Sequence, residues 1–400
     1  MRAVGIICEY NPFHNGHVFH IRRAREQTGL PVVCVMSGNF VQRGEAAVMN
    51  KFARAKTAVL YGADLVLELP VSWACAGAQR FAQGGIGLLA ALGPVSHFAF
   101  GSESADLASI TAAAHLMSDA GVNEQIRTLL SGGVTYAVAR QRAIKEVNPE
   151  AAARLSSPND TLAVEYIRAV FENGFSLTPV CIRREGAGHD GTAVGQFAPA
   201  SVLRAFLRAG HIEEARPFLP ESSRRVLEEE MQAGRAPVDG HALDTAVMSL
   251  LRRMSAKDFA ELPDISEGLE YRLARAAQEA VDPDDFCIRA KTKRYSYARL
   301  RRICMAAFLG LIRDITQKEV PYARVLAFNG MGRALLREIK NIPVITKAAD
   351  GRKLGGTVAQ YLELEARADD LYALAYPARA ARYGGQGWTH SPVYIHDTAI

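Results

Sequence analysis

The sequence predicts an α/β protein in which a parallel sheet occupies roughly the first half of the chain and a mainly α-helical domain follows. Three observations lead to this prediction. Short apolar runs rich in Val and Ile alternate with helical periodicity over residues 1–212, which is the pattern of strand–helix–strand units. Glycine-framed loops follow several of these runs, at the carboxyl ends of parallel strands, where open α/β sheets bind ligands. Over residues 213–376 strand patterns nearly vanish and helical periodicity dominates.

Length and composition agree with two folded units. A chain of 400 residues has the length of about two domains, and we expect residues 1–212 to form the α/β domain and residues 213–400 the mainly helical one. At 49% hydrophobic residues the chain can bury sizeable cores. Its net charge of +5 permits nucleic-acid binding without requiring it.

The cysteines and the apolar runs indicate a cytoplasmic protein. The six cysteines are scattered, with no Cys-x-x-Cys pair, so they are typical of reduced core thiols and not of zinc ligands or disulfides. No signal peptide is expected, because residues 1–8 already have a strand pattern. No run of about 18 apolar residues occurs, so no membrane span is expected. The oligomeric state is open.

The first twenty residues have the pattern of a strand, a turn and a helix. Residues 1–8 form a short apolar, β-branched run typical of a buried parallel strand. Asn11 and Pro12 favour a turn, and helical periodicity begins at His17. His14, His17 and His20 therefore lie near the start of the helix.

This arrangement is suited to a nucleotide. A helix N-terminus presents free N–H groups and the positive end of the helix dipole, which attract phosphate. Histidines at that point can donate hydrogen bonds to phosphoryl oxygens and to a leaving pyrophosphate. Gly16 lets the backbone approach a ligand. A capped helix with surface histidines is the plainer alternative, but the His-x-x-His spacing of His14 and His17 behind a strand favours a functional site.

The segment from residue 5 to residue 20, Gly-Ile-Ile-Cys-Glu-Tyr-Asn-Pro-Phe-His-Asn-Gly-His-Val-Phe-His, is similar to the HxGH signature of the nucleotidyltransferase superfamily. Its long form resembles the bacterial tRNA(Met) cytidine acetate ligase family. The resemblance implies a Rossmann-like nucleotidyltransferase domain in which His14 and His17 are catalytic. It also implies ATP contacts from Ile7, Glu9, Tyr10, Asn11, Pro12, Phe13, His14, Asn15, Gly16, His17 and His20.

A second strand is predicted at residues 31–36, followed by the glycine-framed loop 37–45. Arg43 in this loop could reach a phosphate or a carboxylate, although an isolated loop arginine is more often solvated. The loop matches the family segment Ser-Gly-Asn-Phe-x-Gln-Arg-Gly-Glu, which implies a catalytic role for Arg43. The family usually continues with Pro-Ala where this chain has Ala46 and Ala47.

Charged residues on the next two elements are interpreted as structural. A helix is predicted over residues 50–61, with Lys51 and Arg54 expected on its solvated face. A third strand is predicted over residues 63–70, in which Asp64 and Glu68 are expected to be polar groups at the strand ends.

Further segments resemble the family after later strands. A helix at residues 78–91 precedes a fourth strand at 97–100, and the family's ATP-binding glycine corresponds to Gly101. A turn at residues 156–160 offers Asn159 or Asp160 as the cap of a helix over residues 162–173. The family's nucleotide-binding asparagine corresponds to Asn159.

A fifth strand is predicted at residues 177–182, before a glycine-rich loop at 183–190. The family's ATP-contacting arginine corresponds best to Arg184, with Arg183 as the neighbouring candidate. A helix is predicted to open at residues 198–204, where Ser201 can cap it. Ser201 and Arg204 also resemble a Ser/Thr-x-x-Arg helix start that closes over the β- and γ-phosphates in the superfamily.

The most informative stretch of the second half is residues 289–302. It holds seven basic residues in fourteen, with no acidic residue and with two tyrosines interleaved. Lys and Arg neutralise phosphates and tyrosine can stack on an unpaired base, whereas a solvated helix face is the structural alternative. The family has the same Lys-Thr-Lys-Arg-Tyr segment, which implies tRNA contacts from Lys291, Lys293, Arg294, Tyr295, Arg299 and Arg302.

The resemblance makes the expected reaction concrete. Acetate is expected to attack ATP, giving acetyl-adenylate and pyrophosphate, and the acetyl group is then expected to pass to N4 of the wobble cytidine of elongator tRNA(Met). Mg²⁺ is expected to bridge the phosphates of ATP, and the sequence shows no dedicated metal-binding cluster. Two alternatives stay open: a small-molecule adenylyltransferase of cofactor biosynthesis, and a non-catalytic RNA-binding protein with a nucleotide fold.

Overall fold

The computed structural model describes residues 1–185, 195–266, 268–315 and 319–396. Its centre is one sheet in the order β10-β8-β5-β2-β1-β6-β7, with β9 paired to β8, and a separate hairpin pairs β3 with β4. The strands are β1 (Ala3–Cys8), β2 (Val32–Ser37), β3 (Phe40–Val41), β4 (Glu45–Ala46), β5 (Leu65–Leu69), β6 (Val95–Ser102), β7 (Thr178–Arg183), β8 (Ala323–Phe328), β9 (Val344–Ile345) and β10 (Val393–Tyr394).

The five strands that the first half contributes to the main sheet are all parallel. β1 lies between β2 and β6, with Ile6 opposite both Cys34 and Ala99, and β5 and β7 continue the sheet outward. β8 joins β5 in the antiparallel direction, and β9 and β10 are parallel to β8. The predicted α/β fold with a parallel sheet followed by a mainly helical region is thus confirmed.

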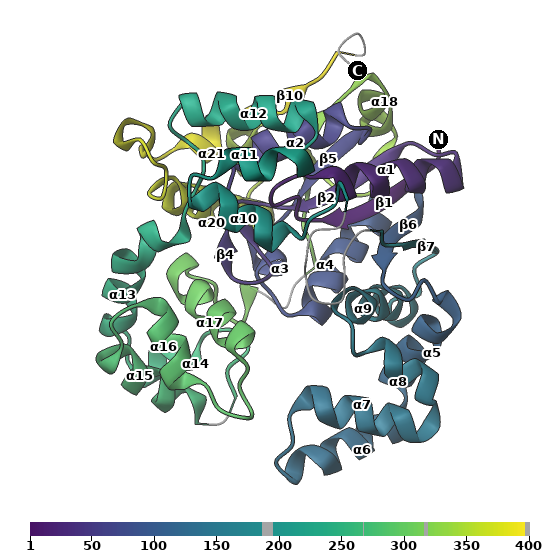
Figure 1. Ribbon diagram of the computed structural model, residues 1–400, viewed down its shortest axis with the longest axis vertical. Helices are drawn as coiled ribbons and strands as arrows, with labels where there is room; N and C mark the ends of the chain where they lie inside the picture. Colours follow the sequence, from purple (N-terminus) through teal and green to yellow (C-terminus); the bar gives the residue numbers. More distant parts are fainter. Residues whose placement is uncertain (186–194, 267, 316–318, 397–400) are drawn as a thin grey trace.

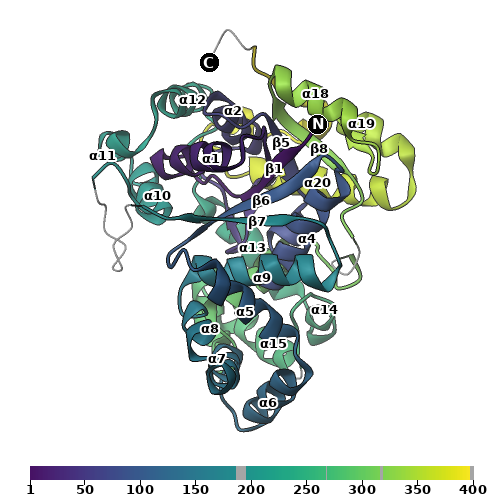
Figure 2. The ribbon, with the colours of Figure 1, turned by 90° about the vertical axis from the view of Figure 1, so that its right-hand side faces the viewer.

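Helices cover both faces of the sheet, and Figure 2 shows α1 and α2 on one side and α4 and α9 on the other. Successive side chains of a strand point to opposite faces, so Val32 and Cys34 of β2 pack in one core while Val33 and Val35 pack in the other. Strands buried on both faces have continuous apolar sequences, which is why the sequence pattern predicts this part of the fold.

The helices of the first half are α1 (Asn15–Thr28), α2 (Lys51–Leu60), α3 (Val71–Ala74), α4 (Ala78–Ala91), α5 (Leu107–Ser118), α6 (Ala120–Ser131), α7 (Tyr136–Val147), α8 (Pro149–Arg154), α9 (Pro158–Glu172) and α10 (Ala200–Arg208). Those that follow are α11 (Ile212–Ala215), α12 (Glu221–Gln232), α13 (Asp244–Arg253), α14 (Ala256–Ala260), α15 (Leu269–Glu279), α16 (Pro283–Ala290), α17 (Tyr297–Leu309), α18 (Gly330–Glu338), α19 (Ala348–Gly351), α20 (Gly356–Ala373) and α21 (Gln386–Thr389). Short 3-10 turns are η1 (Arg216–Phe218), η2 (Gly240–Leu243), η4 (Arg352–Leu354) and η5 (Arg379–Ala381).

Two helical groups extend away from the sheet on the same side in Figure 1, one formed by α13–α17 and the other by α5–α8. The α13–α17 group packs around a core that contains Leu251, Phe259, Leu273, Phe286 and Leu300 and that continues into the β3–β4 hairpin and α20. Among the described residues no helix is long and apolar enough to cross a membrane.

The expectation that strands nearly vanish after residue 213 was wrong at β8 and β9. β8 is almost entirely buried and extends the sheet beyond β5, while β10 adds one more strand near the end of the chain. The apolar sequence of β8 is short and isolated among helical patterns, so only its pairing with β5 identifies it as a strand. The proposed boundary after residue 212 stays a prediction, although the sheet contains strands from both sides of it.

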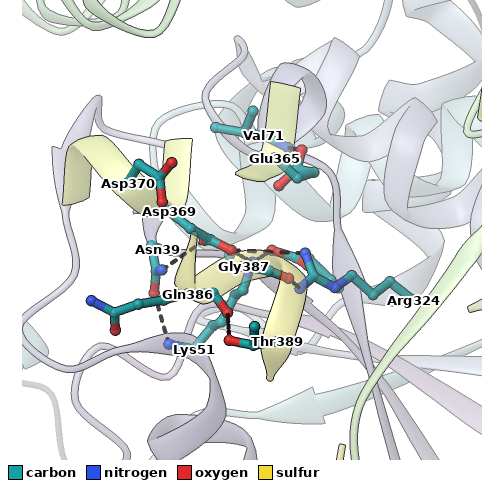
Figure 3. A network of polar contacts seen from close by, with 12 residues as sticks. Asn39, Lys51, Val71, Arg324, Glu365, Asp369, Asp370, Gln386, Gly387 and Thr389 are labelled. Atoms are coloured by element: carbon teal, nitrogen blue, oxygen red, sulfur yellow. Dashed lines mark hydrogen bonds and ion pairs between the residues drawn. The ribbon is translucent and has the colours of Figure 1, made fainter. Parts of the chain in front are cut away.

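Lys51 and Arg54 were expected to be solvated, but both are fully buried. Lys51 Nζ lies 2.6 Å from Glu68 Oε1 and 2.8 Å from Asp369 Oδ2, and Arg324 Nη1 lies 3.2 Å from Glu68 Oε2. Figure 3 shows Lys51, Asp369 and Arg324 converging from α2, α20 and β8. α2 is covered by β8 and α12, so its charged side is interior, which its sequence alone does not reveal.

Candidate active site

A cavity of about 480 Å³ lies at the carboxyl edge of the sheet. Its wall is formed by the end of β1, the start of α1, the β2–α2 loop, the end of β6, and the first turns of α9 and α10. These are the segments that follow parallel strands, as expected for a ligand site in an open α/β sheet. Fourteen of the predicted residues line it: Ile7, Glu9, Tyr10, Asn11, His14, Gly16, His17, His20, Arg43, Gly101, Asn159, Arg184, Ser201 and Arg204.

Three predicted ATP contacts, Pro12, Phe13 and Asn15, are absent from the described lining. Phe13 is buried and its ring stacks on Tyr61 at 5.8 Å. The Asn15 amide donates to the carbonyls of Gln196 and Pro217 at 2.9 and 3.2 Å. Pro12 follows a cis peptide bond.

His14 and His17 cap the start of α1 with their own side chains. The Gly16 N–H donates to His14 Nδ1 at 3.1 Å, and the His14 N–H donates to His17 Nδ1 at 3.2 Å. A neutral imidazole that accepts at Nδ1 carries its proton at Nε2. Each ring therefore keeps one Nε2–H donor for a ligand, and the two rings lie 3.8 Å apart, centroid to centroid.

All three histidines are neutral at ordinary pH. Burial, followed by the charges of Arg184 and Arg204, lowers the pKa of His14 to about 3. Burial and the neighbouring His14 hold the pKa of His17 well below its usual range, while burial and Arg184 lower the pKa of His20 to about 4. His20 Nε2 is buried without a hydrogen-bond partner. The histidines thus offer uncharged donors, and the described cavity lining holds four arginines against three glutamates, which suits an anionic ligand.

Two arginines contribute positive charge to the cavity from different strands and helices. Arg184 follows β7, and its side chain passes beside Gly101, where a Cβ would lie 3.2 Å from Arg184 Cγ. Arg204 of α10 donates from Nη1 to the Asn11 carbonyl at 3.0 Å. Arg183 also lines the cavity, and its Nη2 donates to the Ser104 carbonyl at 3.3 Å. Residues 186–190 of the predicted glycine-rich loop lie outside the described residues.

Two capping predictions were wrong. α10 begins after Pro199, so Ser201 lies within its first turn and does not cap it. α9 begins after Ser157, so neither Asn159 nor Asp160 is its cap. Instead the Asn159 amide donates to the Glu103 carboxylate, and the Asp160 carboxylate accepts the Glu103 N–H at 3.1 Å. This exchange fixes the start of α9 against the end of β6.

The buried side chain of Arg54 holds the loop after β2 through hydrogen bonds to backbone carbonyls. Its guanidinium donates to the carbonyls of Glu9, Gly38, Ser37 and Met49. The Glu9 carboxylate in turn accepts the Gln42 N–H at 2.8 Å, next to Arg43 in the cavity wall. Burial raises the pKa of Glu9, although the Gln42 N–H and the arginines Arg204, Arg54 and Arg43 lower it in part. Sequence reasoning missed Arg54, since its helical position resembled a solvated face.

Sequence reasoning also missed an apolar part of the wall. Phe81 of α4, Phe100 of β6 and Tyr166 of α9 line the cavity, and the Phe100 and Tyr166 rings lie 6.5 Å apart. These residues belong to elements with apolar cores, and nothing in their spacing distinguishes a cavity wall from a core. Among the described residues no group of three or more His, Cys, Asp and Glu side chains could hold a metal ion.

The basic stretch at residues 289–302 forms the end of α16, a short loop and the first half of α17. Lys291, Lys293 and Arg294 are exposed in the loop. Tyr295 is buried, with Arg299 over its ring at 5.1 Å, so its ring is not exposed for stacking. Arg299 also donates to the Asp264 carbonyl, and Arg302 lies 3.9 Å from the Asp264 carboxylate.

Comparison with known proteins gives consistent results. The sequence model of the HIGH Nucleotidyl Transferase family matches residues 1–386. The chain is 35% identical to the tRNA(Met) cytidine acetate ligase of Acetivibrio thermocellus, covering 99% of this chain and 100% of that protein. It is 37% identical to the enzyme of the same name from Caldicellulosiruptor saccharolyticus, covering 99% of each chain.

Solved structures agree. Thermotoga maritima TmcAL bound with alpha-thio ATP has a TM-score of 0.93 at 31% identity, covering 99% of this chain and 100% of that chain. The apo form of the same protein has a TM-score of 0.94 at 32% identity. With a full-length fold match and curated relatives above 30% identity, this chain belongs to the tRNA(Met) cytidine acetate ligase family of HIGH nucleotidyl transferases.

Proposed function

We propose that this chain is an ATP-dependent acetate ligase that acts on tRNA(Met). Its relatives carry the name tRNA(Met) cytidine acetate ligase, and a structural neighbour binds an ATP analogue. In the proposed reaction, an acetate oxygen attacks the α-phosphorus of ATP, and the bond from that phosphorus to pyrophosphate breaks. The product is acetyl-adenylate, a mixed anhydride with AMP as a good leaving group.

In the second step N4 of the wobble cytidine of elongator tRNA(Met) attacks the acetyl carbonyl, AMP leaves, and the nitrogen loses a proton. The lone pair of this amine is delocalised into the ring, so it is a weak nucleophile and needs the activated acyl group. Base-modifying enzymes take their target base out of the stack, and we expect the same of this cytidine.

The observation that carries the proposal is the hydrogen bonding of His14 and His17. Because both Nδ1 atoms accept backbone N–H groups, both Nε2–H groups are left to donate at the cavity wall to phosphate oxygens as charge develops on pyrophosphate. Arg184 and Arg204 would bind the triphosphate, and Arg43 would act beside them. Mg²⁺ would enter bound to the phosphates of ATP.

The test is isotope exchange between pyrophosphate and ATP, measured without RNA over a panel of small carboxylates. Acetate-dependent exchange, followed by transfer of labelled acetate to tRNA(Met), is the expected result. Exchange driven by a nucleotide or a phosphopantetheine would instead indicate a small-molecule adenylyltransferase. If no carboxylate supports exchange with or without total tRNA, the chain is a binding protein and the proposal is wrong.

A further inference from the structure

The side chain of Glu45 lies between the nucleotide cavity and the basic helix α17. Its carboxylate is 3.8 Å from Arg204 Nε, 3.9 Å from Arg208 Nη2 and 3.7 Å from Arg301 Nη1. Arg204 and Arg208 belong to α10, whereas Arg301 belongs to α17. Only 14% of the Glu45 side chain is exposed, so this carboxylate is largely enclosed by its three cations.

None of these three distances is that of a charge-assisted hydrogen bond, which is about 2.7–2.9 Å. The Glu45 carboxylate therefore attracts three guanidinium groups electrostatically and forms a short hydrogen bond with none of them. Arg208 has one further acidic neighbour, Asp239, at 4.0 Å, and its Nε is buried without a hydrogen-bond partner. The ion pairs of this cluster join three guanidinium groups to two carboxylates, Glu45 and Asp239. Asp244 and Asp284 line the smaller cavity beside Arg301, so Arg301 has acidic neighbours other than Glu45.

Glu45 also borders two separate cavities. With Arg204 it lines the nucleotide cavity, and with Arg208 and Arg301 it lines a neighbouring cavity of about 90 Å³. The described lining of the nucleotide cavity does not include Arg301. Glu45 is therefore the carboxylate through which a change at Arg301 can reach the phosphate-binding side.

The backbone keeps Glu45 at this position. Gly44 has φ +70°, and a Cβ on it would lie 2.8 Å from the Arg301 carbonyl oxygen. The turn between β3 and β4 therefore packs directly against the backbone of α17. Within the turn, the Gly44 N–H donates to the Val41 carbonyl at 2.9 Å. A residue with a side chain at position 44 would separate the hairpin from the helix.

We infer that Glu45 is a positioning residue that shares Arg204 with the phosphates of ATP and Arg301 with a phosphate of the RNA. The inference rests on the proposed function. When an RNA phosphate takes Arg301, Glu45 loses one partner and pairs more strongly with Arg204. Arg204 then binds the β- and γ-phosphates less strongly, so RNA docking on α17 promotes the release of pyrophosphate. The coupling is reciprocal, because linkage between two binding sites always is.

The test uses Arg301→Gln without RNA, since this variant removes the same partner from Glu45. The dissociation constants of ATP and pyrophosphate should rise about two- to fivefold, the scale of a partly exposed ion pair. When Glu45 is already replaced by Gln, adding Arg301→Gln should leave the dissociation constants of ATP and pyrophosphate unchanged. Glu45→Gln alone should bind pyrophosphate more tightly than the unmodified protein, and Glu45→Asp should keep part of the coupling.

Matched controls are Arg352→Gln and Glu363→Gln, which break an exposed pair of 3.0 Å remote from the site and should leave both constants unchanged. Melting temperatures would show that each variant folds. The inference would be overturned if Arg301→Gln changed the dissociation constants equally in the unmodified protein and in Glu45→Gln, or changed them in neither. In both cases the protein would still bind ATP. Absence of ATP binding in the unmodified protein would instead contradict the proposed function.

Discussion

Asn39 and Asp369 are joined by a hydrogen bond of 2.8 Å from Asn39 Nδ2 to Asp369 Oδ1, although 330 residues separate them in the sequence. Asn39 Oδ1 accepts the Lys51 N–H at 2.8 Å on its other side. Further along α20, the Tyr372 hydroxyl donates to the Ala47 carbonyl at 2.7 Å. The late helix α20 thus fixes both ends of the loop that carries Arg43 and Glu45 into the cavity, and Figure 3 shows the contact of Asp369 with Asn39.

Replacing Asn39 with alanine should destabilise the fold and weaken ATP binding together. The change leaves the Lys51 N–H and one Asp369 oxygen without a partner in the interior, which costs about 1–3 kcal/mol. Urea denaturation measures the free energy of unfolding, and titration with ATP measures affinity. Asn123→Ala removes a half-buried hydrogen bond to the Met117 carbonyl and an exposed one to the Asp119 carbonyl. It should have a much smaller effect on stability and none on ATP binding. An equal effect of both variants would contradict a role for Asn39 in holding the loop.

Lys51→Met should destabilise the protein strongly. Its ammonium is buried between Glu68 and Asp369, and removing one partner of a buried ion pair costs about 3–5 kcal/mol. Lys56→Met on the same helix removes only an exposed pair with Glu229 and should cost about 1 kcal/mol or less. Comparable losses in the two variants would show that the interior network contributes little.

A second consequence of the network concerns Glu365. Lys51 and Arg324 supply two positive charges, and Glu68, Asp369 and Glu365 supply three carboxyl groups around them. Burial and the charge of Glu68 raise the pKa of Glu365 well above its usual range, so Glu365 is the protonated member. Glu365→Gln, which mimics that form, should therefore leave stability nearly unchanged at neutral pH, whereas a loss as large as that of Lys51→Met would contradict this assignment.

Stability should fall on acidification below pH 6.5 because of the neutral histidines. The unfolded chain takes up protons near pH 6.5, but the folded protein takes them up only when the pH approaches about 4 at His20 and about 3 at His14. The stability that these neutral histidines contribute is complete above pH 6.5. It is lost as the pH falls from 6.5 towards the folded-state pKa, by about 1.4 kcal/mol per pH unit for each histidine. Urea denaturation between pH 7.5 and 5 measures the slope, which should be smaller in His14→Gln; an unchanged slope would contradict the neutral state.

His14→Ala and His17→Ala should each slow acetate-dependent exchange between pyrophosphate and ATP by about 100-fold or more. Each variant removes one Nε2–H donor from the charge that develops on the leaving group, and single donors of this kind contribute about 10²–10³. His115→Ala on α5 is the control, since His115 packs against Phe171 at 4.5 Å away from the cavity. Exchange at the normal rate in the double variant would remove these histidines from the reaction.

Charge reversal at Lys291, Lys293 and Arg294 should weaken RNA binding without affecting exchange in the absence of RNA. These three basic residues are exposed in the loop between α16 and α17. Removing a side chain that binds an RNA phosphate should lower the slope of log affinity against log salt by about one. Lys353→Glu, an exposed lysine paired with Asp350, is the control. Unchanged tRNA affinity in the triple variant would leave the small-molecule adenylyltransferase as the better interpretation.

Local sequence patterns were sufficient to predict the parallel sheet and the location of the cavity. Strands buried on both faces and helices with an apolar side leave local patterns of fixed period, and the HxGH segment lies directly after the first of these strands. Most of the individual site residues were implied by the family resemblance, and fourteen of them line one cavity, because segments that follow parallel strands meet at the same edge.

The environment of the charged residues, in contrast, depends on contacts that the sequence does not reveal. Lys51 is interior because Asp369 of α20, far along the chain, closes over it beside Glu68. Arg54 is interior because backbone carbonyls of the segments after β1 and β2 surround its guanidinium. Tyr295 is interior because it packs into the core of the α13–α17 group. The shared position of Glu45 depends on three arginines from two distant helices. Burial and ion pairing arise from contacts between distant segments, and no local pattern encodes which segments those are.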